Sequence, residues 1–407
     1  MSKLIISRME IEGILCDYTA LIDRNRLLEF RFQPVSQKSI LDNIYVGQVD
    51  NLVKNIQGAF IKIDKDTPCY YDLKEQNTAI YTSPKKSAQM VPGDQVLVQV
   101  CRDAIKSKQP AVTTNLSFKG KYLVLTTGKK GIGMSAKLDA EEKKRLKGWL
   151  EEADAVNYGL VIRTNARDAS KKELLKELEL LKKRCERVLQ FGVSRTCFSL
   201  LEEREDFYLS VLRNTYTRDL EEIITDIPKL HEQIQSYLAE NQPEDLGRLR
   251  LYEDALLPLI KLYGIEKKFD EIRQEKVWLK SGGFLVIQPT EALVSIDVNT
   301  GKFIGKKKAE ETYRKINLEA AEEIARQLRV RNLSGMILID FINMSNPDHN
   351  EELLHVLQKY LKKDPVKAIV HDMTQLNLVE VTRKKVEKPL SEEITALRQH
   401  AEHTRRI

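Results

Sequence analysis

Apolar and polar residues alternate over short runs in the first third of the chain, and a period of two is typical of β-strands. Turn signals at Glu12-Gly13 and Asp23-Arg24-Asn25 separate the first runs. Within residues 38–112, short strands at this spacing, with Pro92-Gly93-Asp94 before the last of them, favour a small barrel of the OB type. The predicted strands lie around residues 4–6, 14–16, 27–30, 44–49, 58–63, 70–73 and 95–100.

The middle of the chain mixes strand and helix patterns. Residues 122–126 and 160–163 are predicted strands, and leucines at helical spacing over 174–189 predict an amphipathic helix with a charged face. The apolar run 207–212 is predicted to be a strand. Helices are then predicted around residues 217–224, 231–240 and 265.

The last part of the chain, residues 276–395, has a different rhythm, in which apolar strand runs alternate with helical patterns. This alternation indicates an α/β layer structure. The fold class predicted for the whole chain is therefore multidomain, α+β with an α/β part. The predicted elements are strands at 283–288, 292–298, 335–341 and 368–371, and helices at 308–330 and 350–362.

Composition narrows the class of protein. The chain has 407 residues, of which 42% are hydrophobic and 31% charged, a normal globular balance. Apolar runs such as 336–339 are far too short to cross a bilayer, and the N-terminus lacks a signal-peptide layout, so we expect a cytoplasmic protein with no membrane partner. Five scattered cysteines without a Cys-x-x-Cys pair argue against disulfides or a zinc site.

Basic residues are concentrated in two places. The net charge is +6, and residues 301–331 carry nine Lys or Arg against five Glu. Residues 381–407 carry seven against four. A local basic excess suits a polyanionic partner, although a solvated helix face gives the same pattern.

Two carboxylates end apolar runs in the α/β part. Asp297 follows residues 292–296 and Asp340 follows 336–339. If the two strands are neighbours, the carboxylates meet at one edge of the sheet, where a hard cation such as Mg²⁺ relieves their repulsion. Asn299 points to the same side as Asp297, and Gly301 allows a tight turn.

A structural role for both aspartates is equally consistent with the residues alone. They could cap the following elements or pair with arginines of the intervening helix, namely Arg326, Arg329 and Arg331.

The barrel segment has candidate RNA-contacting residues, because aromatic rings stack on bases and lysines attract phosphate. The candidates are Phe60, Tyr70 and Lys108. Core packing of Phe60 is an equally good interpretation of its spacing.

Longer motifs resemble the ribonuclease E/G family. Glu291-Ala-Leu-Val-Ser-Ile-Asp-Val-Asn-Thr-Gly301 is similar to the catalytic signature of that family. So is Ile324-Ala-Arg-Gln-Leu-Arg-Val-Arg-Asn-Leu-Ser-Gly335, which continues into Ile337-Leu-Ile-Asp-Phe-Ile-Asn-Met344. The resemblance implies that Asp297 and Asp340 are catalytic and ligate Mg²⁺, and that Asn299 orients the site.

The resemblance extends over most of the chain. Asn43-Ile-Tyr-Val-Gly-Gln-Val49 resembles the opening of the OB barrel, and Phe60, Tyr70 and Lys108 occupy its RNA-contacting positions. The segments 120–125 and 159–164 resemble a sensor of 5′-monophosphate ends. There the resemblance implies a phosphate site, whereas Arg163 alone would suggest a surface ion pair. The implied phosphate-binding residues are Gly120, Val124, Arg163 and Thr164.

The resemblance also implies a domain organisation. An RNase H-like subdomain is interrupted by the OB domain and the sensor, and a DNase I-like catalytic subdomain follows. The expected parts are 1–37 and 209–275 (RNase H-like), 38–112 (OB), 113–208 (sensor), 276–395 (DNase I-like) and 396–407 (tail).

Two departures from the family pattern affect the expectations. The family's Cys-Pro-x-Cys zinc link is not found in the sequence, so a homodimer of this chain would not be zinc-linked. Lys367 stands where an arginine of the sensor region is expected, and a lysine lacks the bidentate fork of arginine. We therefore expect weaker selectivity for 5′-monophosphate.

The predicted function is Mg²⁺-dependent hydrolysis of single-stranded RNA to 5′-phosphate and 3′-hydroxyl ends, with 5′-monophosphorylated substrates favoured. The expected substrates are mRNA and rRNA precursors, in rRNA processing and mRNA decay. A non-catalytic RNA- or ribosome-binding factor is the alternative, and a DNA nuclease on the same α/β layer is a third possibility.

Overall fold

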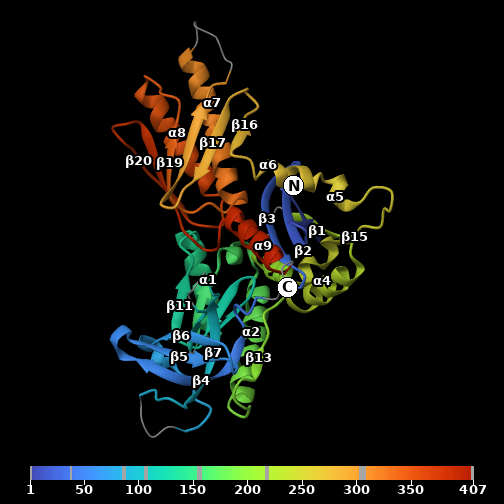
Figure 1. Ribbon diagram of the computed structural model, residues 1–407, viewed down its shortest axis with the longest axis vertical. Coiled ribbons are helices and arrows are strands. Elements are labelled where there is room, and N and C mark those ends of the chain that lie inside the picture. The colour runs from blue at the N-terminus through green and yellow to red at the C-terminus, as the bar shows by residue number, and fades with distance from the viewer. Residues whose placement is uncertain are drawn as a thin grey trace. The chain divides into compact units, whose positions relative to one another are not determined.

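The computed structural model describes residues 2–36, 39–84, 89–104, 109–153, 158–215, 220–301 and 309–404. The chain divides into two compact units (Figure 1). The first unit comprises Met1–Ser36, Asp219–Leu238 and Glu244–Ile407. The second comprises Gln37–Arg218 and Ala239–Pro243. The finer domain boundaries expected from the sequence stay predictions.

A closed β-barrel forms one part of the second unit. Five strands follow one another in the order β4-β5-β6-β8-β7, and β7 pairs back onto β4, which closes the barrel as an OB-type fold requires. A short strand, β13, extends the sheet beside β4. The strands are β4 Ile44–Val53, β5 Gly58–Lys62, β6 Pro68–Asp72, β7 Gln95–Arg102, β8 Ala111–Thr113 and β13 Leu200–Glu202.

A four-stranded sheet and two long helices complete the second unit. The strand order is β11-β12-β10-β9, and α2 packs against β9 and β10. Both helices begin with a capping box, at Asp139 and at Ser170, in which the cap and the third helical residue satisfy each other's backbone N–H groups. The elements are β9 Ser117–Lys119, β10 Leu123–Thr126, β11 Gly131–Met134, β12 Gly159–Ile162, α1 Ala140–Glu152 and α2 Lys171–Gly192.

The first unit contains a five-stranded sheet built from distant parts of the chain. Its order is β15-β14-β1-β2-β3, with β14 parallel to β1. The strands are β1 Ser2–Ile11, β2 Ile14–Asp23, β3 Arg26–Pro34, β14 Leu220–Thr225 and β15 Leu249–Leu251. The accompanying helices are α4 Pro228–Asn241, α5 Leu259–Leu262, α6 Ile265–Glu271 and α9 Leu390–Thr404.

A six-stranded sheet forms the rest of the first unit. Its order is β16-β17-β18-β19-β21-β20, and β18 and β19 are its parallel neighbours. The chain crosses from β18 to β19 through the long helix α7. The elements are β16 Lys276–Trp278, β17 Phe284–Pro289, β18 Leu293–Asn299, α7 Ala309–Val330, β19 Gly335–Asp340, α8 Pro347–Leu361, β20 Ala368–Met373 and β21 Leu378–Arg383.

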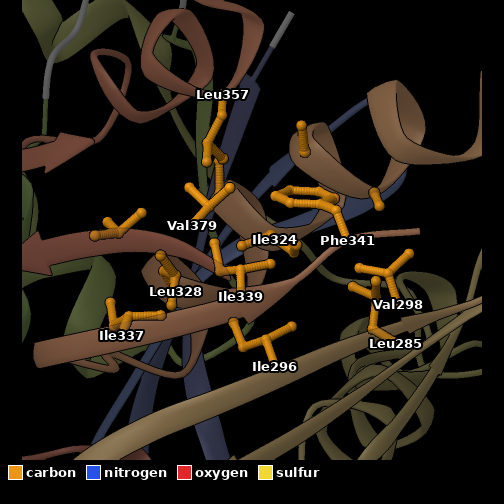
Figure 2. Close-up of a cluster of buried hydrophobic side chains, with 14 of the residues drawn as sticks. Leu285, Ile296, Val298, Ile324, Leu328, Ile337, Ile339, Phe341, Leu357 and Val379 are labelled. Atoms are coloured by element: carbon orange, nitrogen blue, oxygen red, sulfur yellow. The ribbon is translucent and has the colours of Figure 1, made fainter. Parts of the chain in front are cut away.

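One face of this sheet is covered by α7 and α8. Figure 2 shows the core between them, in which side chains from the strands meet Ile324 and Leu328 of α7 and Leu357 of α8. Ile296 and Ile339 in the central strands are fully buried. Because side chains alternate along a strand, the residues between these buried ones lie on the opposite face.

Two predicted elements are wrong. Residues 207–212 were expected as a strand, but Phe207–Asn214 is helix α3, which buries Phe207, Tyr208 and Leu212. A short apolar run fits either element, and here the buried side chains follow helical spacing. The helix expected around 217–224 is also wrong. Residues 217–219 lie outside the described residues, and residues 220–224 belong to strand β14, Leu220–Thr225. Pairing with β1 decides its conformation.

Candidate catalytic and RNA-binding sites

Asp297 and Asp340 lie directly opposite each other on neighbouring strands. They are register partners in the parallel pair β18–β19, at the carboxyl ends of both strands. Both side chains are exposed, while Ile296 and Ile339, one residue earlier, are buried in the core. The alternation that buries the isoleucines therefore places both carboxylates on the open face of the sheet. The prediction that the two strands are neighbours is confirmed.

Asn299 is positioned as expected, on the same side of β18 as Asp297. Its side-chain Nδ2 donates a 2.6 Å hydrogen bond to Oδ2 of Asp297. The turn after Asn299 is also as expected. Gly301 has a φ of +68°, and a Cβ there would collide with the backbone carbonyl oxygen of Gly282. A larger residue at this position would move the strand end that carries the site.

The arginines that could have paired with the aspartates have other partners. Arg326 pairs with Glu323, and the Nη2 of Arg329 lies 2.6 Å from a carboxylate oxygen of Glu29. Arg331 donates from Nε to the side chain of Gln327. The alternative in which these arginines neutralise the two aspartates is therefore wrong.

The two carboxylates and Asn299 are a suitable donor set for Mg²⁺. Mg²⁺ binds through one or two carboxylates and keeps several waters, and two adjacent carboxylates favour a cation between them. Within the described residues, no cluster of three or more His, Cys, Asp or Glu side chains is arranged to hold a metal. This donor set therefore differs from a structural zinc site, in which four protein ligands enclose the metal.

Phe60 and Tyr70 form an aromatic pair on the outside of the barrel. They are register partners on β5 and β6, and their ring centroids lie 6.4 Å apart in an edge-to-face arrangement. Both rings are half-buried, whereas their neighbours Ile61 and Tyr71 are fully buried inside the barrel. Core packing of Phe60 is therefore wrong. Lys108, the third candidate, lies outside the described residues.

The four expected phosphate-binding residues are only partly brought together. Arg163 donates from Nη1 to the carbonyl oxygen of Gly120 at 2.5 Å, and from Nη2 to Oδ1 of Asn214 at 2.7 Å. The hydroxyl of Thr164, the next residue, lies 2.9 Å from that of Ser135. Val124 pairs across the strands with Val161, which is 43% exposed. Asn214 and Ser135 were not recognised from the sequence.

A buried carboxylate explains the need for glycine at position 120. Glu177 of α2 accepts hydrogen bonds from the backbone N–H groups of Lys121, Tyr122 and Leu123 at 2.7–2.8 Å. A Cβ on Gly120 would collide with this carboxylate. Burial raises the pKa of Glu177, and the three N–H donors and the Arg163 charge oppose that rise.

One feature of the sequence points to a buried role for Glu177. Glu177 is a charged residue on the apolar stripe of α2, with Leu174, Leu178 and Leu181 around it. A charge at such a position is buried, and it needs hydrogen-bond partners.

Comparison with known proteins adds to this geometry. Residues 117–386 match the sequence profile of the Ribonuclease E/G family. The chain is also 32% identical to Ribonuclease G of Salmonella typhimurium over 378 residues, which are 90% of this chain and 77% of that protein. The chain belongs to the ribonuclease E/G family.

The chain has similar sequence identity to other members of the ribonuclease E/G family. Ribonuclease G of Escherichia coli K12 is 32% identical, with 91% of this chain and 78% of that protein covered. Ribonuclease E of Synechocystis sp. is 33% identical over 84% of this chain, which corresponds to 52% of the longer relative. These ribonucleases support an endoribonuclease role and an RNA substrate for this chain.

The part that matches the ribonuclease E/G profile includes both carboxylates and Arg163, whereas Phe60 and Tyr70 precede it. None of the helices in the described ranges combines the length and the apolar character needed to cross a membrane.

Proposed function

We propose that this protein hydrolyses single-stranded RNA with Mg²⁺ and leaves 5′-phosphate and 3′-hydroxyl ends. The observation that carries the proposal is the pair Asp297 and Asp340, held in register on the open face of a sheet while the neighbouring arginines pair elsewhere. Membership of the ribonuclease E/G family supports the same reaction.

Each residue of the site has a defined part in this proposal. Asp297 and Asp340 would hold Mg²⁺, which when bound lowers the pKa of water and neutralises phosphate charge. Asn299 restrains the carboxylate of Asp297 through its 2.6 Å hydrogen bond, so that the second oxygen keeps a fixed direction. The rigid β18–β19 pair fixes the separation of the two aspartate backbones.

Substrate selection is assigned to the second unit. Phe60 and Tyr70 would stack on bases, with Lys108 on the backbone, and Arg163 and Thr164 would bind a 5′-phosphate. Arg163 is already oriented by its hydrogen bonds to Gly120 and Asn214. A preference for 5′-monophosphorylated RNA follows from this assignment.

The family also suggests a wider setting for the proposed reaction. We assign rRNA processing and mRNA decay in the cytoplasm as its processes. We also assign RNase H-like and DNase I-like character to the parts of the first unit.

The decisive experiment replaces the carboxylates. We expect Asp297→Asn and Asp340→Asn each to lower kcat/KM on a 5′-monophosphorylated oligoribonucleotide by more than about 100-fold, because loss of even an outer partner of a metal ligand costs about 10–100-fold. Asp270→Asn is the matched control, since Asp270 is also exposed in the first unit and loses the same charge. Product ends are identified with and without Mg²⁺.

Three results would contradict the proposal. Undiminished cleavage by either variant would remove the carboxylate pair from the reaction. Binding of RNA that survives EDTA with no product under any condition would indicate a non-catalytic RNA-binding factor. Equal cleavage of DNA of the same sequence would indicate a general nuclease.

A further inference from the structure

An aromatic pair and a lysine lie beside the catalytic strands, on the same open face of the six-stranded sheet. The rings of Trp278 on β16 and Phe284 on β17 have centroids 5.3 Å apart and are tilted by 59°. The Nζ of Lys276 lies 4.3 Å from the Trp278 ring centroid and 3.7 Å from that of Phe284. This cluster, which we call the Trp278 cluster, consists of Lys276, Trp278 and Phe284.

The Trp278 cluster does not belong to the hydrophobic core. Trp278 is 64% exposed even with Lys276 against it, while the next residue, Leu279, is buried. Phe284 is half-buried, and its neighbour Leu285 is fully buried in the core beneath the sheet. Exposure of a tryptophan to this extent leaves apolar surface in water, and tryptophans are enriched at binding interfaces.

Strand register places the cluster next to the proposed metal site. Trp278 is opposite Phe284, and Phe284 is opposite Asn299. One row along the sheet, Val286 separates Lys276 from Asp297. Neighbouring strands are about 4.8 Å apart, so the Trp278 backbone lies roughly 10 Å from that of Asn299.

We propose that the Trp278 cluster is a nucleobase-binding subsite for the residue of single-stranded RNA that adjoins the cleaved phosphodiester. Trp278 offers the stacking surface, Phe284 holds its ring at a fixed tilt, and Lys276 attracts the phosphate backbone. The inference rests on the proposed ribonuclease function, because the carboxylate pair fixes where the phosphodiester lies.

The chemistry of the cluster favours a nucleobase over another occupant. Aromatic rings combined with a cation suit a ligand that is planar and carries negative charge, as a nucleotide does. The cluster is also continuous with the site that is proposed to hold the phosphodiester of the same strand, through the row Trp278, Phe284 and Asn299.

The test combines protein variants with base removal from the substrate. A single abasic nucleotide is placed in turn at each position around the cleavage site of one single-stranded oligoribonucleotide. In the wild type we expect one position to lower kcat/KM about tenfold, which is the size of one lost stacking contact. Trp278→Ala should lower kcat/KM about tenfold on the intact oligonucleotide. In this variant, an abasic nucleotide at that position should not lower kcat/KM any further.

Two variants serve as controls for this test. Trp278→Phe keeps an aromatic ring and should retain most of the activity. Leu256→Ala removes a side chain of the first unit that is 96% exposed, and it should behave as the wild type. The proposal is overturned if Trp278→Ala cleaves the intact oligonucleotide like the wild type, or if the abasic effect is equal in both proteins.

A binding measurement separates this inference from the proposed reaction. The chain has two tryptophans, so Trp149→Phe leaves Trp278 as the reporter. In EDTA, binding of a single-stranded oligonucleotide, followed by anisotropy of a label on it, should quench Trp278 fluorescence. If the wild type cleaves no RNA, the proposed reaction is contradicted. Quenching of Trp278 on binding would still support the nucleobase subsite. Saturated binding without quenching, or no binding, overturns the subsite.

Discussion

At Gly58, the absence of a side chain determines where the Tyr70 ring can lie. A Cβ on Gly58 would be 2.6 Å from Cε2 of Tyr70, so the ring occupies the space that any other residue would fill. The same ring meets Phe60 edge to face on the outer surface of the barrel. One missing carbon thus helps to orient the aromatic pair proposed to contact RNA.

We predict that Gly58→Ala weakens binding of single-stranded RNA about fivefold or more, because the displaced Tyr70 ring loses part of a base-stacking contact. The measurement is fluorescence anisotropy of a labelled oligoribonucleotide in EDTA. Gly148→Ala is the control, since Gly148 lies inside α1 with open space around its Cα. It should leave the affinity unchanged and stabilise the helix by about 1 kcal/mol. Unchanged affinity for Gly58→Ala would exclude Tyr70 from the RNA surface.

Single residues differ in how much of their structural setting can be predicted from the sequence. The pairing of Asp297 with Asp340 could be predicted because each ends an apolar run, and a carboxylate there needs a partner. Glu177 and Trp278 could not be assigned in the same way. Their roles depend on which backbone N–H groups or rings lie opposite them, and these come from other elements.

Helix α9 contributes a titratable group to the packing of the first unit. Leu390, Ile394 and Leu397 of α9 pack into the core below the five-stranded sheet. Burial raises the pKa of Glu393, on the same helix, from 4.5 to about 7, and the charge of Arg31 only partly opposes this.

This raised pKa predicts a loss of stability with rising pH. Between about pH 4.5 and 7, the folded protein holds a proton on Glu393 that the unfolded chain has released, so the free energy of unfolding falls as the pH rises. From pH 5 to pH 8, we expect the free energy of unfolding of Glu393→Gln to rise by about 2–3 kcal/mol relative to that of the wild type. Urea unfolding in a Trp149→Phe background, followed by Trp278 fluorescence, measures this.

Glu392→Gln is the matched control for that measurement, because Glu392 is exposed on the adjacent position of the same helix. It should change the free energy of unfolding equally at both pH values. A wild-type protein whose stability is flat across this window, or rises, would show that the pKa of Glu393 is not raised in the folded protein.

At the scale of elements, the sequence predicted the regular α/β part better than the rest. The strands that became β17, β18 and β19 and the helices α7 and α8 had long, strongly periodic patterns. Helix α3 and strand β14 were assigned to the wrong class. Both are short, and pairing or packing with residues far along the chain determines their conformation, which local pattern cannot show.

At the scale of the whole molecule, the chain forms two units with separate hydrophobic cores. Each unit contains one of the two tryptophans, Trp149 in the second and Trp278 in the first. Chains with several cores commonly unfold in more than one step. Once one tryptophan is replaced, the other therefore reports on the unfolding of its own unit alone.

We predict that the two units unfold at different urea concentrations. Trp278→Phe reports the second unit and Trp149→Phe the first, and the fluorescence midpoints of the two variants should differ, each with an m-value smaller than expected for the full chain. Far-UV circular dichroism of the wild type should show both steps. Coincident midpoints and m-values from the two reporters would mean that the units unfold as one.

The parallel pairing of β18 with β19 has a consequence for the synthesis of the protein. Parallel strands need a crossover, so Asp297 acquires its partner only after α7 and β19 have been translated and have folded back. A growing chain that ends before Asp340 carries half of the carboxylate pair. Under the proposed function, a nascent chain therefore lacks the complete carboxylate pair until most of that chain has emerged.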